Sequence, residues 1–385
     1  MPYYVQRGSV PPKRHTQFRQ PDGSLYREEH ISRQGFSDIY SNVYHIHPPT
    51  QVVRVGELRP VETEVWEKPH RHHHFRTAGV NSEGDAIGSR RLLLFNEDVR
   101  LQKAHPGESM AGFYRNACGD EVIFVHRGSG TLHSNLGMLK FAEGDYIVIP
   151  RAVIWKLVLD GPCRFLIFET TGPVETPGRY RNRHGQLKEG APYYERDIRV
   201  PEFVEPEDEE GEFEVVVKVR DGHQSYFYRN HPFDAVGWDG YYYPWIFNIK
   251  DFEPITGKIH QPPPVHQTFQ ASGLVICSFV PRLFDFHPDA IPAPYSHSNV
   301  DSDEVIYYVE GNFMSRKGME EESISFHPPG PPHGPQPGKT EDSIGLKETS
   351  EFAVMMDTFK PLKVAAACEE IDDAEYSLSW LEDSV

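Results

Sequence analysis

Residues 294–333 read PYSHSNVDSDEVIYYVEGNFMSRKGMEEESISFHPPGPPH, and this stretch decides the fold. An apolar run at residues 305–309 is followed by the turn residue Gly311 and by a second short apolar run that ends at Phe326. Short apolar runs separated by a glycine are typical of neighbouring β-strands. The stretch closes on a Pro-x-Gly-x-x-His sequence, residues 328–333. It therefore predicts two strands followed by a turn and a histidine.

Three residues of this stretch have the chemistry of metal ligands. His297 precedes the first run, Glu304 begins it, and His333 follows the second run. Pairing of the two strands would bring these side chains together. Two imidazoles and one carboxylate form the facial triad that binds non-haem Fe(II) and leaves coordination positions open for substrate and oxygen. The stretch therefore predicts the active site of an Fe(II)-dependent dioxygenase.

Histidines are concentrated around this site. A single histidine is more often a surface residue or a satisfied core residue than a ligand. Six of the 20 histidines, however, fall within residues 260–333: His260, His266, His287, His297, His327 and His333. A cluster that coincides with the ordered carboxylate and proline pattern favours a metal site.

Composition limits the fold and the partners of the chain. Its 385 residues suggest two or three domains, and 38% hydrophobic residues are enough for real cores. The 33 prolines and 31 glycines favour short strands and turns over long helices. A formal net charge of −18 argues against a nucleic acid or an anionic membrane as partner.

The chain shows no targeting or membrane signal. No apolar run approaches the ~18 residues of a membrane span, and residues 1–15 lack the apolar core of a signal peptide. The four cysteines are scattered, with no CxxC spacing, so neither a disulfide framework nor a zinc ribbon is indicated. We expect a reduced, cytoplasmic protein without a membrane partner.

The first half of the chain repeats the pattern of residues 294–333. Short apolar runs separated by glycine-bearing turns fill residues 91–171, which is typical of a β-sandwich or barrel. Within them, Glu121 stands as far before Gly128 as Glu304 stands before Gly311. In the same alignment, Tyr114 replaces His297 and Trp155 replaces His333. We predict an internal duplication whose first copy has lost both metal histidines.

This duplication divides the chain into two predicted domains. Residues 1–200 would form an N-terminal arm and a degenerate barrel without metal ligands, and residues 201–385 the metal-binding barrel. The acidic run 202–212 would be the linker. Spacing of apolar positions predicts a short C-terminal helix within residues 364–381. The run His70-Arg71-His72-His73-His74 is predicted to be a solvent-exposed loop, since adjacent strand residues point to opposite faces.

The paired, glycine-punctuated motifs resemble the jelly-roll β-barrels of the cupin superfamily. The usual first motif carries His-x-His before its glutamate, whereas this chain has His297-Ser298-Asn299 before Glu304. Replacement of the second histidine by Asn299 reduces a four-ligand site to the facial triad. The resemblance implies a mainly β protein with two cupin domains, the first of them degenerate.

Within that superfamily, two segments resemble the homogentisate 1,2-dioxygenase family. The first is Pro294-Tyr295-Ser296-His297-x-Asn299, continuing through Glu304 to His327 and His333-Gly334-Pro335. The second is Pro232-Phe233-Asp234-Ala235-Val236-Gly237-Trp238, continuing to Phe252. The resemblance is clear over residues 230–360 and looser before them, and the chain is shorter than the better-known members, so it implies a divergent branch.

The family resemblance implies a reaction and roles for named residues. His297, Glu304 and His333 would bind Fe(II), and the enzyme would open homogentisate to maleylacetoacetate with O2 in tyrosine and phenylalanine catabolism. His260, or alternatively His266, would be the acid–base group. Substrate-binding positions would be Tyr295, His327, His266 and Phe313. Phe313 stands where the family has a tyrosine. The resemblance therefore leaves open which residue contacts the carboxylate of the substrate. The family also implies a homo-oligomer.

Two other functions compete with this one. A gentisate-type or other hydroquinone-type ring-cleaving dioxygenase would use the same three ligands. A non-enzymatic bicupin that binds small molecules belongs to a different class. The retained triad argues against the second alternative, because nothing structural requires His297, Glu304 and His333 together.

Overall fold

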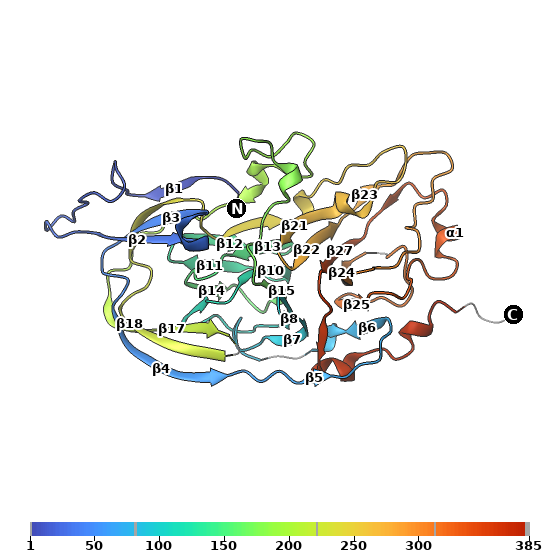
Figure 1. The fold of residues 1–385 in the computed structure, drawn as a ribbon, viewed down its shortest axis with the longest axis horizontal. Helices are drawn as coiled ribbons and strands as arrows, with labels where there is room; N and C mark the ends of the chain where they lie inside the picture. Colours follow the sequence, from blue (N-terminus) through green and yellow to red (C-terminus); the bar gives the residue numbers. More distant parts are fainter. Residues whose placement is uncertain (1, 81–82, 221, 312, 382–385) are drawn as a thin grey trace.

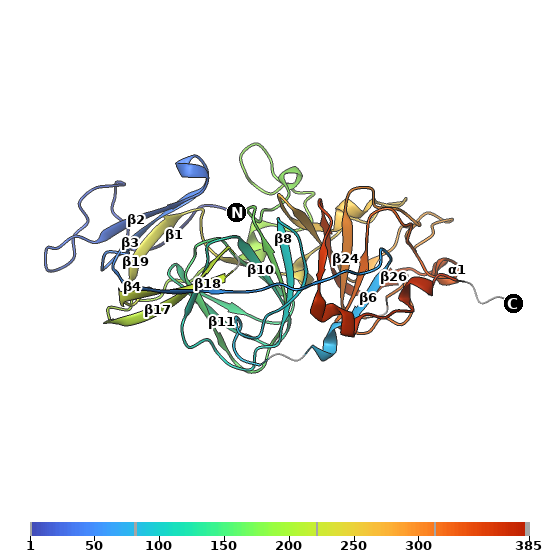
Figure 2. The same ribbon diagram turned by 60° about the horizontal axis from the view of Figure 1, so that its bottom comes forward.

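The computed structural model describes residues 2–80, 83–220, 222–311 and 313–381. Strands dominate it, and the one α-helix in these ranges is the short α1 (Lys339–Ser343). No helix in the same ranges is long and apolar enough to cross a membrane. Figures 1 and 2 show one group of strands in the middle of the molecule and a second group at the right of the view. The predicted mainly β fold is confirmed.

Two sheets form the first barrel. The larger sheet has the strand order β16 (Ile198–Arg199), β20 (Trp245–Asn248), β13 (Asp145–Ile149), β10 (Asp120–Arg127), β15 (Arg164–Thr170), β8 (Val99–Ala104), β7 (Arg91–Phe95), β28 (Lys363–Ala365), β5 (Val65–Trp66). The smaller sheet has the order β12 (Gly137–Phe141), β11 (Gly130–Ser134), β14 (Trp155–Leu159), β9 (Phe113–Asn116), β17 (Glu210–Val219), β18 (Gly222–Asn230), β4 (Val52–Pro60). The strand β4 of the N-terminal segment is thus an edge strand of the smaller sheet.

The second barrel contains the stretch that opened the sequence analysis. Its main sheet has the order β21 (Gln267–Ala271), β22 (Leu274–Phe279), β27 (Phe352–Thr358), β24 (Asp303–Glu310), β25 (Ser323–His327), β6 (His73–Arg76). A small ladder joins β23 (Arg282–Leu283) to β26 (Glu348–Thr349). The two apolar runs predicted as neighbouring strands are therefore β24 and β25, which pair directly.

The N-terminal arm is more ordered than its sequence suggested. It supplies three strands of a separate sheet, in the order β1 (Val5–Gly8), β19 (Ala235–Gly240), β3 (Tyr40–His45), β2 (Arg27–Ser32). The arm then continues through β4 along the side of the first barrel, as Figure 2 shows. The arm thus packs against its own chain, with β19 as the central partner.

Strand pairing crosses the predicted domain boundary between residues 200 and 201. The strands β17, β18 and β20 follow the boundary but pair with strands of the first barrel. In the opposite direction, β6 lies in the first half and joins the second barrel. The C-terminal β28 returns to the first barrel. Strands added in this way pair sheet edges that would otherwise expose unpaired backbone groups. Each barrel therefore contains strands from both sides of the predicted boundary.

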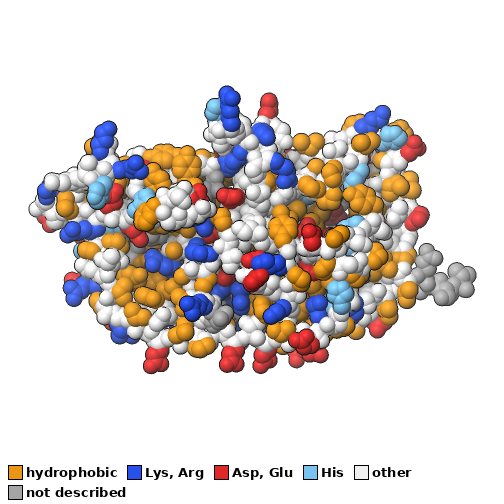
Figure 3. Space-filling view, viewed as in Figure 1, with side chains coloured by type: hydrophobic (Ala, Val, Ile, Leu, Met, Phe, Trp, Pro, Cys, Tyr) orange, Lys and Arg blue, Asp and Glu red, His pale blue; other side chains and the backbone are white. Residues whose placement is uncertain are grey.

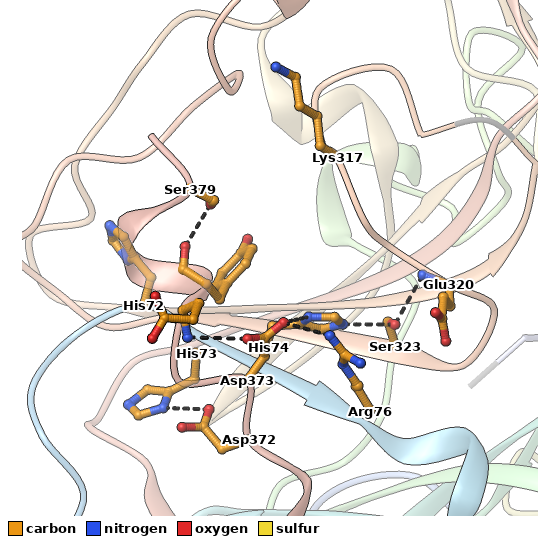
Figure 4. Close-up of polar contacts among 12 residues, drawn as sticks. His72, His73, His74, Arg76, Lys317, Glu320, Ser323, Asp372, Asp373 and Ser379 are labelled. Carbon is orange, nitrogen blue, oxygen red and sulfur yellow. Dashed lines mark hydrogen bonds and ion pairs between the residues drawn. The ribbon is translucent and has the colours of Figure 1, made fainter. Parts of the chain in front are cut away.

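The histidine run at residues 70–74 is not the exposed loop that the sequence predicted. His72, His73 and His74 are buried, and β6 pairs with β25 so that His73 lies opposite Phe326. Figure 4 shows Asp372 and Asp373 of the C-terminal tail beside His73 and His74. His73 Nδ1 lies 2.9 Å from Asp372 Oδ1, and His74 Nε2 lies 2.9 Å from Ser323 Oγ. The run therefore has a structural role, as an edge strand of the second barrel.

The predicted C-terminal helix is also corrected. Residues 364–381 contain the end of β28 and two short 3₁₀ helices, η7 (Ala366–Ile371) and η8 (Tyr376–Leu378). Val364 and Cys368 are buried against the first barrel, and Tyr376 is buried beside the histidine run. The spacing of apolar residues predicted one helix, but tertiary contacts decided the conformation. The first part of the segment packs against the first barrel, and the part around Tyr376 packs against the second.

The two barrels share one continuous core. Tyr146 of β13 is fully buried, and its hydroxyl lies 2.8 Å from Ser278 Oγ of β22. A buried ion pair lies at the same junction, where Lys103 Nζ donates to Glu322 Oε2 at 2.7 Å and to the hydroxyl of Tyr307 at 2.8 Å. Arg164 also donates to Glu322. Glu322 immediately precedes β25, so this junction fixes the start of a strand of the second barrel.

Candidate metal centre

The structure brings His297, Glu304 and His333 together. Glu304 is on β24, and the backbone N–H of each histidine donates to the carbonyl of the other, both at 2.8 Å. His297 Nε2 lies 3.3 Å from Glu304 Oε2, and His333 Nε2 lies 3.3 Å from Glu304 Oε1. One ligand atom from each residue lies within 4.8 Å of the others. Residues separated by up to 36 positions thus converge on one point.

The surroundings of these residues suit a cation. Burial opposes ionisation of Glu304, but hydrogen bonds from His297, His327 and His333 hold the pKa of its carboxyl well below the usual range. Both ring nitrogens of His333 are buried, and apart from the 3.3 Å contact of Nε2 with Glu304 Oε1 they have no polar side-chain or backbone partner among the described residues. A buried imidazole of this kind calls for an explanation such as a bound ion. Two imidazole nitrogens and a carboxylate oxygen are a suitable donor set.

His327 lies behind Glu304, away from the cavity described below. Burial lowers the pKa of His327 to about 3, so its ring is neutral. Its Nδ1–H donates to Glu304 Oε1 at 2.8 Å, and its Nε2 accepts from the hydroxyl of Tyr376 at 3.0 Å. The ring therefore orients the carboxylate. No sequence pattern indicated Tyr376, because this contact spans 49 positions.

A cavity of about 320 Å³ opens beside Glu304. Four of the residues expected around the substrate lie in its wall together with His297 and Glu304: His260, His266, Tyr295 and Phe313. The rest of the wall is mainly apolar and includes Phe279, Pro292, Ile306, Met314 and Met355. A concave apolar site with a few polar groups is typical of a small-molecule pocket. His327 is not among the residues that line it.

The two candidate acid–base histidines differ in their surroundings. His260 is part-exposed, and its Nδ1 lies 3.4 Å from Asp285 Oδ2. The ring lies 5.3 Å from that of Tyr295. His266 is buried, and burial with the charges of Arg282 and His260 lowers its pKa to about 3. Only His260 thus combines a carboxylate partner with access to solvent, which favours it as the proton carrier.

Two arginines in the cavity wall were missed at the sequence level. Arg316 is buried, and its Nη1 donates to the carbonyl of Gly334 at 2.6 Å, while its Nε has no partner among the described residues. Arg282 pairs with Glu351 at 3.1 Å. Phe313 packs edge-on against Tyr308, with ring centroids 4.5 Å apart. The cationic groups of this wall therefore come from Arg282 and Arg316.

The first barrel repeats the backbone of the candidate site and its glutamate without the two histidines. Tyr114 pairs with Trp155 as His297 pairs with His333, and Glu121 pairs with Ile149 as Glu304 pairs with His327. This register matches the predicted duplication.

In the first barrel, an arginine neutralises the carboxylate that corresponds to Glu304. Glu121 accepts two hydrogen bonds from Arg90, at 2.8 and 3.0 Å, and one from Asn116 at 2.9 Å. The guanidinium thus provides the positive charge that a metal would supply to the carboxylate.

Comparison with known proteins gives a consistent result. A family model described as "Homogentisate 1,2-dioxygenase N-terminal" matches residues 97–249, which lie mainly in the first barrel. A Saccharolobus solfataricus protein named a putative dioxygenase is 42% identical over 99% of both chains. A Rhodopseudomonas palustris protein named homogentisate 1,2-dioxygenase is 24% identical over 97% of this chain and 90% of its own.

Among solved structures, a cupin 2 conserved barrel domain protein from Leptotrichia buccalis covers 78% of this chain and is itself covered completely, with 8% identity and a TM-score of 0.34. The near full-length match to the Saccharolobus protein and the family-model match are decisive. The chain therefore belongs to the homogentisate 1,2-dioxygenase family.

Proposed function

We propose that the protein is an Fe(II)-dependent ring-cleaving dioxygenase that opens homogentisate to maleylacetoacetate, with both atoms of O2 entering the product. The observation that carries this proposal is the convergence of His297, Glu304 and His333 beside an apolar cavity. The Rhodopseudomonas palustris relative, whose name states this activity, supports the choice of substrate.

The residues present fit the metal that the proposal requires. The ionised carboxylate of Glu304 and neutral imidazoles of His297 and His333 would hold it. When bound, Fe(II) would supply open positions at which a substrate oxygen and O2 meet and exchange electrons. His327 and Tyr376 would keep the carboxylate in the orientation for binding.

The cavity wall fits an aromatic acid. Apolar side chains such as Phe279 and Ile306 offer a surface to a planar ring. A substrate carboxylate requires a cation in this low-dielectric site, and Arg316 and Arg282 are the arginines in the wall. Arg316 and Arg282 would bind the substrate carboxylate, which the ring of Phe313 cannot do.

We expect His260→Ala to retain metal and lose turnover. The His260 ring, oriented by Asp285, would accept and return the phenolic proton of the substrate. Loss of such a group lowers kcat by about 10²–10⁴-fold. Single-turnover kinetics with metal analysis of the same sample measures both quantities. His266→Ala is the matched control, and a larger loss of turnover there would transfer the acid–base role to His266.

We expect His327→Ala to weaken metal binding by about 10–100-fold, as is usual for a group that orients a ligand. The reason is the hydrogen bond to Glu304, which the variant removes. Equilibrium dialysis against a competing chelator measures the affinity. Tyr376→Phe, which removes only the outer hydroxyl, should have a smaller effect. A raised KM with unchanged metal affinity would instead assign His327 to substrate binding.

Oxygen uptake with homogentisate and with gentisate tests the proposed reaction directly. Homogentisate should be consumed faster, with one O2 per substrate. Faster uptake with gentisate would favour the gentisate-type alternative, which the phenylalanine at position 313 keeps open. The absence of uptake from metal-loaded protein with either compound would favour the non-enzymatic bicupin.

A cytoplasmic homo-oligomer is part of the proposal. The segment 259–300, which contributes to the cavity wall, exposes several large apolar side chains: Ile259, Leu283, Phe286, Ile291, Tyr295 and Val300. Figure 3 shows apolar side chains gathered at the right of the view, over the second barrel. Contiguous exposed apolar surface is typical of a contact between proteins, and a second copy of the chain is the proposed partner.

A further inference from the structure

A second cavity, of about 510 Å³, lies in the first barrel. Its wall includes Tyr114 and Arg90, which occupy the positions around the lost metal site. It therefore corresponds in the first barrel to the cavity beside Glu304 in the second. The mechanism proposed above uses none of its residues.

The wall of this cavity is strongly cationic. Five cationic side chains line it, against the two acidic ones of Glu62 and Glu64: Arg90, Arg91, Arg100, Lys218 and Arg220. The whole chain, in contrast, carries a net charge of −18. Concentration of one sign in a concave site attracts ligands of the opposite sign. Burial and the charges of Lys218 and Arg90 lower the pKa of His223 in the same wall, in agreement with a positive potential there.

Part of this charge is free to bind a ligand. Arg90 is committed to Glu121, and Lys218 to Glu169. By contrast, Arg91, Arg100 and Arg220 form no ion pair within the described ranges of the chain, and Arg100 donates a long hydrogen bond of 3.4 Å to the hydroxyl of Thr63 in the same wall. Guanidinium groups match the geometry of carboxylates with two parallel hydrogen bonds. The uncommitted arginines thus suit a carboxylate.

Gln102 supplies an independent indication of a ligand. It is only 8% exposed, lines the cavity, and its Nε2 has no hydrogen-bond partner among the described residues. Gln102 and Arg100 are two positions apart on β8, so their side chains lie on the same face of the sheet. A buried amide donor without a partner is costly, and an acceptor oxygen of a ligand would satisfy it.

We infer that the first barrel binds a small organic carboxylate, held by Arg100 and the amide of Gln102. The apolar part of the wall would contact the body of this ligand: Val61, Ile87, Leu92, Ala365, Ala366 and Ala367. The first barrel would thus hold an anion in the cavity that corresponds to the one beside Glu304. The site does not depend on the reaction proposed for the second barrel.

Calorimetric titration of the full chain with succinate and with phenylacetate tests this inference. The His297→Ala background separates the site from the metal centre, where carboxylates also coordinate. We expect one of the two compounds to bind at one site per chain in both backgrounds. Arg100→Gln and Gln102→Leu should each weaken binding about tenfold or more, since each removes a charge-assisted hydrogen bond. Gln102→Glu should abolish it.

The control is Arg183→Gln, which removes the same charge from an exposed loop outside the cavity. The affinity of this variant for the carboxylate should equal that of the parent protein. Equal weakening in Arg183→Gln and Arg100→Gln would overturn the inference, as would binding that disappears with His297→Ala alone. Inorganic phosphate that binds as tightly as the carboxylates, or no binding of either carboxylate at millimolar concentration, would also overturn it.

Discussion

Replacement of His297 with alanine is expected to remove iron and oxygen uptake together. His297 provides one of only two imidazoles in the proposed triad, and its Nε2 faces Glu304 at 3.3 Å. Loss of an outer-shell partner costs about 10–100-fold in metal affinity, and loss of a direct ligand should exceed that range. Metal analysis of anaerobically purified variant protein, with oxygen uptake on the same sample, measures the effect.

Tyr114→Phe is the matched control, because Tyr114 has the position of His297 in the first barrel. Its hydroxyl lies 3.3 Å from Glu121, whose carboxylate is already neutralised by Arg90. The variant should keep the iron content and the oxygen uptake of the parent protein. Equal iron loss in the two variants would contradict a single metal site in the second barrel.

Glu322→Gln is expected to destabilise the protein by about 3–5 kcal/mol, the usual cost of removing one partner of a buried ion pair. The carboxylate is 2% exposed and neutralises the fully buried ammonium of Lys103. Burial lowers the pKa of Lys103 to about 8 even with Glu322 beside it, so the variant would have to leave the ammonium without its partner or take its proton away. The midpoint of urea unfolding, followed by tryptophan fluorescence, measures the loss.

Glu321→Gln provides the comparison at the neighbouring position. Glu321 is 44% exposed and pairs with Arg127, which is 54% exposed. Surface pairs contribute about 0–1 kcal/mol, so this variant should be nearly neutral. The double variant Lys103→Met/Glu322→Gln should regain much of the stability, because no buried charge is left without a partner. Equal destabilisation by Glu321→Gln and Glu322→Gln would contradict the proposed role of the buried pair.

The sequence predicted the metal stretch and its duplicate well. The three candidate ligands stand before, at the start of and after two apolar runs. These runs were predicted as neighbouring strands, and they form β24 and β25, which pair directly. Tyr114 was matched with His297 because each stands seven positions before the glutamate of its copy, and the strand register agrees with this match. Local spacing carries this information because hairpin neighbours are close in the sequence.

Contacts between distant segments could not be predicted from the sequence. The histidine run became a buried strand because Asp372, about 300 positions away, satisfies His73. The carboxylate of Glu121 is neutralised by Arg90. Arg90 lies before the duplicated motif, so the alignment of the two copies could not predict this contact. Tyr376 reaches His327 from a tail whose apolar positions suggested a helix. In each case tertiary partners decided the conformation, and no periodic pattern marks such partners.

The metal content of the anaerobically purified wild-type protein tests the central claim most directly. A single facial triad in the second barrel, with an arginine at the equivalent position of the first, predicts about one iron per chain. Zinc in place of iron, or protein without metal, would contradict the proposed dioxygenase.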